Sequence, residues 1–230
     1  MWQPPTRIHR CAGRGCKAAT IIIGFQRDHS HETMQTNELI DWPTLCVFGD
    51  SITVGSDDRE AGGWVARLRL DLNARGKISV YNLGVDGDRS EQLLRRLAGE
   101  AAARNASVIV IAIGANDLGW HGTEGTDGAL FRERYDSILS EAERFTPRIL
   151  ALGLPGVDEA NESHGVRNTQ VIAFNRVIEE LAREHGAEFL SLYGLLSPAD
   201  FVDGLHPNAS GHAKLAPPIG RELERLGWDE

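Results

Sequence analysis

The stretch TLCVFGDSIT, residues 44–53, decides the fold of this chain. Its apolar run, residues 45–48, stops at Gly49-Asp50-Ser51, and a short apolar run bounded by turn residues is typical of a buried strand. The stretch therefore predicts a strand that delivers Ser51 to a sharp turn, where a rigid element holds the hydroxyl as a nucleophile requires. Gly-Asp-Ser is also common turn chemistry, so the stretch alone leaves a purely structural turn open.

The same pattern, a short apolar run followed by turn residues, recurs along the chain. Between the runs lie segments with helical spacing, such as Trp64, Leu68 and Leu72 at every fourth position. Strands that alternate with helices indicate a parallel sheet, and right-handed crossovers place helices on both of its faces. The sequence thus predicts a three-layer α/β/α domain with a five-stranded, doubly wound parallel sheet. The predicted strands are residues 44–48, 78–83, 108–113, 148–154 and 188–192.

Two further polar blocks follow the second and third predicted strands. Gly87 can offer a backbone N–H with no side chain in the way, and Asn116 can offer a side-chain amide. Ligands of such sheets bind outside the carboxyl ends of the strands, where both residues join Ser51. Donors of this kind stabilise the oxyanion that develops in acyl transfer. Gly84, closer to the strand end, is an alternative to Gly87, and a purely conformational role is the alternative for each block.

Near the end of the chain, Asp203 and His206 supply a carboxylate and an imidazole three residues apart. A serine, an imidazole base and a carboxylate that orients the base form a catalytic triad, which is recognised by roles rather than by order. A capping or turn role is the alternative for both residues, because Pro207 and Asn208 look like the start of a helix. The spacing favours Ser51, His206 and Asp203 as one catalytic group.

These four blocks, in this order, resemble the GDSL family, also called SGNH hydrolases. The resemblance runs from about residue 44 to the C-terminus, with Ile52 in place of the usual leucine after the serine. It implies a flavodoxin-like strand order 2-1-3-4-5 and a serine hydrolase of carboxylic esters or thioesters that needs no cofactor and no metal. The roles it assigns are nucleophile for Ser51, general base for His206, orienting partner for Asp203, and oxyanion hole for the N–H groups of Ser51 and Gly87 and the amide of Asn116.

A catalytically silent carbohydrate- or lipid-binding module on the same scaffold is the second hypothesis. The complete set of catalytic residues favours the enzyme. A nucleotide-binding flavodoxin-like domain would need a glycine-rich phosphate loop after the first strand, and the sequence lacks one there. The expected partner is a small-molecule acyl ester, since the family includes lysophospholipases, thioesterases, arylesterases and sugar O-acetylesterases. Two loops, residues 119–128 with Trp120 and residues 155–167, are predicted to shape the pocket.

Composition narrows the partners further. The chain has 230 residues, 41% of them hydrophobic, which suffices for one domain with a substantial core. A formal net charge of −9 argues against nucleic acid and anionic membranes as partners. No apolar run approaches the roughly 20 residues of a transmembrane helix. Three cysteines are compatible with a reducing compartment, so we expect a cytoplasmic location, and the sequence leaves the oligomeric state open.

The first 40 residues are predicted to be a disordered or poorly ordered extension of a domain that spans residues 41–230. Residues 1–33 carry a charge of +3, which leaves −12 on residues 34–230, and they show no helical or strand period. Basic residues before an apolar patch leave a weak export signal open, although no Ala-x-Ala-like cleavage site follows. Upstream sequence wrongly read as coding, with Met34 as the natural start, is a further alternative.

No metal site is expected. Cys11, Cys16 and His29 match the first part of a two-cysteine, two-histidine zinc finger, but His31 follows His29 too closely to complete it. His212 is predicted to be a solvated residue of the last helix rather than a ligand.

The remaining predictions concern local structure. Asp50 is expected to hydrogen-bond the local backbone, and Asp117 is expected to have a structural role. The last helix is predicted to start near residue 208 or 209. It is predicted to break at Pro217-Pro218, because a proline inside a helix removes a hydrogen bond and clashes with the preceding turn.

Overall fold

A five-stranded parallel sheet forms the centre of the protein. The structure, a computed structural model, describes residues 42–120 and 122–228. The strand order is β2-β1-β3-β4-β5, and every neighbouring pair is parallel, which confirms the predicted sheet. The strands are β1 (Thr44–Gly49), β2 (Ser79–Gly84), β3 (Val108–Ala112), β4 (Ile149–Leu152) and β5 (Glu188–Leu190).

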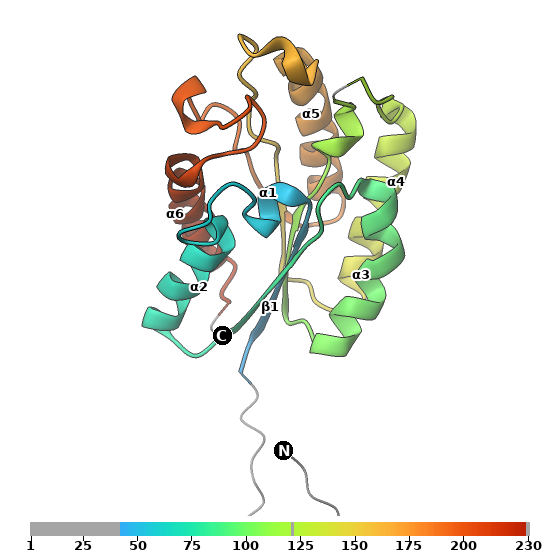
Figure 1. Cartoon of the computed structure of the whole chain (residues 1–230). Helices are drawn as coiled ribbons and strands as arrows, with labels where there is room; N and C mark the ends of the chain where they lie inside the picture. The colour runs from blue at the N-terminus through green and yellow to red at the C-terminus, as the bar shows by residue number, and fades with distance from the viewer. Residues whose placement is uncertain (1–41, 121, 229–230) are drawn as a thin grey trace, which may run out of the picture. The chain divides into compact units, whose positions relative to one another are not determined.

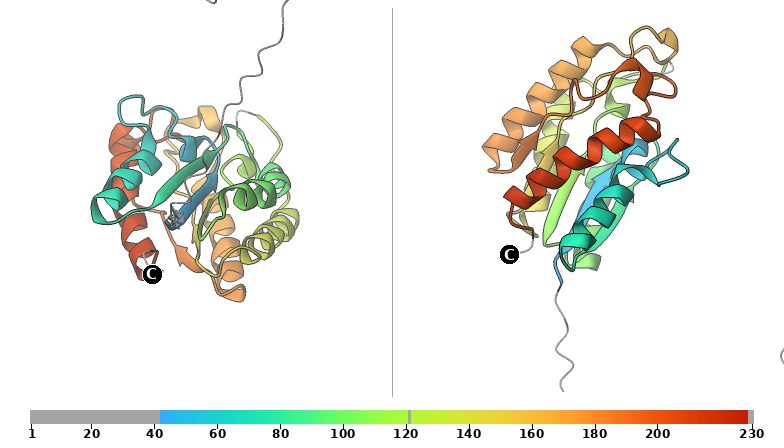
Figure 2. Two further views of the ribbon diagram at one scale, coloured as in Figure 1. Left: turned by 90° about the horizontal axis from the view of Figure 1, so that it is seen from below. Right: turned by 90° about the vertical axis from the view of Figure 1, so that its left-hand side faces the viewer.

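Helices cover both faces of this sheet. The α-helices are α1 (Ser51–Val54), α2 (Gly63–Arg75), α3 (Ser90–Arg104), α4 (Gly128–Glu143), α5 (Asn168–Glu184) and α6 (Ala209–Arg225). The short 3₁₀ helices are η1 (Asn116–Leu118), η2 (Glu162–His164) and η3 (Pro198–Asp200). Helices α2 and α6 pack together on one face, whereas α4 contacts α3 and α5 on the other (Figure 1). The right-hand view of Figure 2 shows α2 and α6 side by side in front of the sheet, so the fold has three layers.

The central strands are buried from both sides. All six residues of β1 are buried. In β3, four buried Val and Ile residues are followed by Ala112, which is partly exposed. Such continuous apolar strands suit a parallel sheet with helices on both faces. The largest fully buried side chains include Phe48 of β1, Trp64 of α2, and Phe131 and Tyr135 of α4, so both layers of the core are filled by aromatic rings.

The last helix differs from its prediction. Helix α6 runs without interruption through Pro217 and Pro218. The two prolines lie on the outer side of the helix, where Pro217 is exposed and water can satisfy the carbonyl groups that lose their N–H partners. On the inner side, Leu215, Ile219 and Leu223 are fully buried and hold the helix against the sheet. Packing of that inner side outweighs the lost hydrogen bonds.

The described residues begin two positions before β1. The predicted N-terminal extension, residues 1–40, lies outside them, and so do its candidate export signal and its partial zinc-finger pattern. Within the described part of the chain, no helix combines the length and the apolar character needed to cross a bilayer.

Candidate active site

The turn after β1 holds a serine on a rigid support. Ser51 begins α1, and Oδ1 of Asp50 caps this helix by accepting a hydrogen bond from the N–H of Ile52 at 3.0 Å. Gly49 is required by close packing, because a Cβ there would lie 2.1 Å from Oγ1 of Thr53. The strand and sharp turn predicted around Ser51 are therefore present, and the local structural role of Asp50 is confirmed.

Ser51, His206 and Asp203 lie in one hydrogen-bonded chain. Oγ of Ser51 lies 2.9 Å from Nε2 of His206, and Nδ1 of His206 lies 2.8 Å from Oδ2 of Asp203. When Nδ1 donates to the carboxylate, Nε2 is left to accept the proton of the serine. The fold thus brings together a serine and a histidine that are 155 positions apart in the sequence.

The carboxylate of Asp203 is held by its own turn. Its Oδ1 accepts hydrogen bonds from the N–H groups of Leu205 at 3.0 Å and His206 at 2.7 Å. Burial raises the pKa of Asp203, but the hydrogen bonds from the His206 side chain and from these two N–H groups outweigh burial and hold the pKa below its ordinary value. Asp203 is therefore ionised at neutral pH and can stabilise a positive charge on the imidazole.

The loop before α6 is fastened by residues that the sequence did not single out. Nδ2 of Asn161 donates to the backbone oxygen of Asp203 at 2.7 Å. The N–H of Val202 donates to the backbone oxygen of His206 at 2.9 Å. Asn161 belongs to the loop of residues 155–167, for which the sequence predicts only a role in shaping the pocket. No spacing signal marks such a contact, because it depends on the path of two loops.

The two candidate oxyanion donors, Asn116 and Gly87, lie close together. Nδ2 of Asn116 donates one of its two hydrogens to the backbone oxygen of Asp88, the residue after Gly87, at 2.9 Å. Gly87 has a φ of 79°, a left-handed conformation that favours glycine, and a Cβ there would meet open space. Gly84 has a different task, since a Cβ there would lie 2.5 Å from the backbone nitrogen of Val54. Glycine at position 84 lets β2 approach α1.

The structure confirms the prediction for Asp117 and contradicts the prediction for His212. Asp117 accepts hydrogen bonds from the N–H and the hydroxyl of Ser90 at 2.8 and 2.6 Å, which ties η1 to the start of α3 and confirms its structural role. The prediction of a solvated His212 is wrong, because its side chain is fully buried with Nε2 3.3 Å from the backbone oxygen of Ser56. His212 lies three residues before Leu215 on the inner side of α6, a helical spacing that could have revealed the burial.

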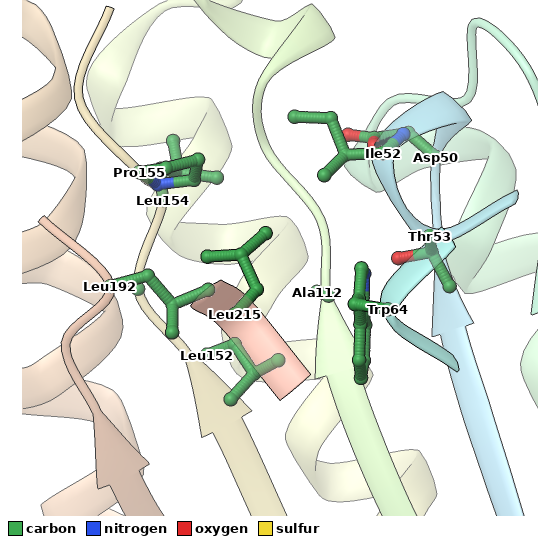
Figure 3. Close-up of a pocket in the computed structure, with 11 residues that line it drawn as sticks. Asp50, Ile52, Thr53, Trp64, Ala112, Leu152, Leu154, Pro155, Leu192 and Leu215 are labelled. Atoms are coloured by element: carbon green, nitrogen blue, oxygen red, sulfur yellow. Dashed lines mark hydrogen bonds between the residues drawn. The ribbon is translucent and has the colours of Figure 1, made fainter. Parts of the chain in front are cut away.

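A small cavity lies beside the turn that holds Ser51, at the carboxyl ends of β1, β3 and β4 (Figure 3). Its volume open to the centre of a water molecule is about 20 Å³, which is room for one water. The polar members of its wall are Asp50 and Thr53, and no described residue pairs with the buried Oγ1 of Thr53. Burial raises the pKa of Asp50 to about 7. The apolar wall includes Ile52, Trp64, Leu154, Pro155, Leu192 and Leu215.

The chain is similar to known proteins over most of its length. The model of the GDSL-like Lipase/Acylhydrolase family matches residues 47–214. The thioesterase 1/protease 1/lysophospholipase L1 of Escherichia coli is 26% identical over 189 residues, which cover 80% of this chain and 84% of the relative. Among solved structures, a lipase/acylhydrolase from Enterococcus faecalis is 27% identical with a TM-score of 0.69, and the match covers 80% of this chain and 96% of that one. An acetyl xylan esterase from Geobacillus stearothermophilus is 25% identical with a TM-score of 0.67 and coverages of 79% and 94%.

Proposed function

The chain belongs to the GDSL-like lipase/acylhydrolase family, and from this premise we propose that it hydrolyses esters with Ser51, His206 and Asp203 as its catalytic triad. The esterases and acylhydrolases among its relatives support ester hydrolysis. The observation that carries the residue assignment is the hydrogen-bonded chain from Ser51 through His206 to Asp203, with its two distances of 2.9 and 2.8 Å.

The proposed reaction forms and then clears an acyl-serine. Nε2 of His206 takes the proton of Ser51 while the serine oxygen attacks the acyl carbonyl carbon, and Asp203 stabilises the resulting imidazolium. The carbonyl electron pair moves onto its oxygen and returns when the alcohol or thiol leaves with the proton from His206. Water then attacks the acyl-serine, again giving its proton to His206, and the carboxylic acid is released as Ser51 regains its proton.

We assign the oxyanion of this reaction to three donors, the N–H groups of Ser51 and Gly87 and the amide of Asn116. Two observations support the set. A Cβ on the left-handed Gly87 would meet open space, and the amide of Asn116 hydrogen-bonds to the backbone oxygen of the next residue, Asp88. An oxyanion donor of this kind acts in the transition state rather than in the bound substrate.

The proposed substrate is a small-molecule acyl ester. The Escherichia coli relative of this chain is named as a thioesterase and lysophospholipase, and the Geobacillus stearothermophilus relative as an acetyl xylan esterase. The preferred acyl length and the preferred leaving group therefore both need measurement. A series of p-nitrophenyl esters from acetate to palmitate gives the acyl length. An acyl thioester, a lysophospholipid and an acetylated xylo-oligosaccharide, compared by kcat/KM, then give the leaving group.

Labelling with a fluorophosphonate tests the residue assignment. Intact mass and peptide mapping should show one adduct, on Ser51, together with loss of ester hydrolysis. Ser51→Ala should take no label and lose about 10⁴–10⁶-fold in kcat while its thermal midpoint stays near that of the wild type. An adduct on another serine would remove Ser51 from its role. A folded wild-type protein that takes no label and hydrolyses no ester, yet binds acyl or sugar ligands, would favour the catalytically silent binding module.

A further inference from the structure

Trp120, in the loop after η1, contacts both halves of the candidate site. Its indole Nε1–H donates to Oδ1 of Asn116 at 3.0 Å. Its ring meets the imidazole of His206 edge to face, with 4.8 Å between the ring centroids and 62° between the planes. One half-buried side chain therefore joins the proposed oxyanion donor to the proposed general base.

The backbone of Trp120 is held by a tight local turn. Its N–H donates to Oγ1 of Thr123 at 3.0 Å, and the threonine hydroxyl donates to the backbone oxygen of Trp120 at 2.8 Å. Gly119, with a φ of 73°, packs so closely that a Cβ there would lie 2.5 Å from the nitrogen of Gly125. The indole thus extends from a defined backbone, which a side chain needs if it is to orient its neighbours.

The hydrogen bond from Trp120 selects one orientation of the Asn116 amide. The terminal torsion of an asparagine has a broad, nearly two-fold preference, so the amide oxygen and nitrogen can exchange places. An indole N–H can only donate, and the backbone oxygen of Asp88 can only accept. Together they direct Oδ1 toward Trp120 and one hydrogen of Nδ2 toward Asp88, and the second hydrogen of Nδ2 stays available for a ligand.

The ring contact restricts the imidazole of His206. Nδ1 of the ring is held by Asp203 and Nε2 by Ser51. The indole adds a third contact, in the edge-to-face arrangement that aromatic pairs prefer. Rotation of the imidazole would therefore disturb the contact with Trp120 as well as the two hydrogen bonds.

We propose that Trp120 is a positioning residue for ester hydrolysis, which aligns the oxyanion amide of Asn116 through its N–H and the base His206 through its ring. This inference rests on the proposed function of the same site. It assigns no chemical step to Trp120, whose effect on the reaction passes through these two neighbours.

Two substitutions separate the two contacts. Trp120→Phe keeps an aromatic ring and removes the N–H, whereas Trp120→Leu removes both. For Trp120→Phe we expect kcat to fall by about 10- to 100-fold with KM nearly unchanged. A misaligned oxyanion donor stabilises the transition state less but leaves substrate binding as it was. For Trp120→Leu we expect a larger fall in kcat.

A double-mutant cycle with Asn116→Ala distinguishes positioning from general damage. Once the amide is gone the N–H of Trp120 has nothing to align, so Trp120→Phe should cost no further activity in the Asn116→Ala background. Trp120→Leu should still cost activity there, since its contact with His206 is independent of the amide. Trp42→Phe, at an exposed tryptophan before β1, is the matched control and should keep wild-type kcat and KM.

The outcomes separate this inference from the function on which it rests. If Trp120→Phe multiplies the loss caused by Asn116→Ala, or raises KM with kcat unchanged, the positioning role is overturned. The positioning role is also overturned if Trp120→Phe keeps wild-type kcat while Ser51→Ala is inactive. That second result would leave the proposed function intact. If Ser51→Ala remains active, the triad is wrong and the inference falls with it. Thermal midpoints and near-ultraviolet circular dichroism of each variant verify that the fold is retained.

Discussion

Asp50 and Ser51 are neighbours in the chain, yet their side chains lie in different environments. The hydroxyl of Ser51 lies against an imidazole, whereas the carboxyl of Asp50 is 1% exposed beside an apolar cavity. Burial is the largest influence on Asp50, and it raises the pKa from 3.8 to about 7. The same turn therefore carries the candidate nucleophile, Ser51, and a buried carboxyl, Asp50, whose ionisation opposes folding.

Asp50→Asn should change how stability depends on pH. Because the pKa of Asp50 is raised in the folded protein, its contribution favours folding most below about pH 4 and is lost as pH rises toward 7. Asparagine keeps the acceptor for the N–H of Ile52 but cannot ionise. The variant should melt several degrees above the wild type at pH 8 and close to it at pH 4, measured by calorimetry at both values. A wild type that is the more stable of the two at pH 8 would contradict the raised pKa.

Asn116→Ala should reveal an oxyanion donor by its kinetic signature. We expect kcat to fall about 10²- to 10³-fold while KM changes little, because the amide bonds to charge that exists only in the transition state. Asn175→Ala removes a different buried amide, one that bonds to the backbone of Leu154, and serves as a comparison for the effect on stability alone. A raised KM with unchanged kcat in Asn116→Ala would instead identify a contact to the bound substrate.

At the scale of the elements, strands were predictable because burial on both faces leaves an unbroken apolar run. The predicted strand of residues 148–154 nevertheless ends at Leu152. The N–H and the carbonyl oxygen of Leu154 both bond to the side chain of Asn175, at 2.6 and 3.0 Å, rather than to a neighbouring strand. An apolar run cannot report such a bond, because the asparagine comes from α5.

The candidate site likewise combines residues that the sequence pattern predicts with contacts that it does not. Ser51, Asn116 and His206 adjoin the ends of strands or helices, so the element pattern and the motif spacing predicted them together. Trp120 and Asn161 act from loops, and their contacts depend on backbone conformations that no periodicity encodes. The candidate triad and oxyanion residues were therefore visible in the sequence, whereas the contacts that Trp120 and Asn161 make with them were not.

Between α4 and α5, one histidine makes a pH-dependent link. The imidazole of His185, at the end of α5, lies 2.9 Å from carboxylate oxygens of both Asp136 and Glu143 on α4. Burial lowers the pKa of His185, but the hydrogen bonds that its ring donates to the two carboxylates, together with their negative charges, outweigh burial and raise the pKa. A raised pKa means that this link stabilises the fold below the unfolded value of about 6.5 and weakens as pH rises through the folded value.

His185→Gln should therefore destabilise the protein in a pH-dependent way. The carboxylates are half exposed, so we expect a loss of about 1 kcal/mol or less, a few degrees in thermal midpoint, at pH 6 and little change at pH 9. Arg225→Gln, which removes an exposed ion pair with Glu222 on α6, is the control and should shift neither midpoint. An equal loss at both pH values would indicate packing rather than charge.

At the scale of the whole molecule, the core closes within the described residues. Strand β1 is an inner strand of the sheet, between β2 and β3, and α2 and α6 pack together on one face of that sheet (Figure 2). We propose that residues 1–33 are dispensable for folding and for activity, and this can be tested directly.

A chain that begins at Met34 should match the full chain in thermal midpoint and in kcat/KM, because the buried core and the candidate site both lie within residues 44–228. Circular dichroism melting and p-nitrophenyl acetate hydrolysis measure the two quantities side by side. A midpoint several degrees lower would show that residues 1–33 pack against the domain.

The separation of Ser51 and His206 in the sequence also determines when, during synthesis of the chain, the two side chains can come together. Ser51 follows β1 and His206 precedes α6, so the 155 positions between them must be synthesised before the two side chains can meet. Under the proposed mechanism, a nascent chain that ends before His206 has no general base for Ser51. We therefore expect ester hydrolysis to begin only after the chain has been synthesised past this residue.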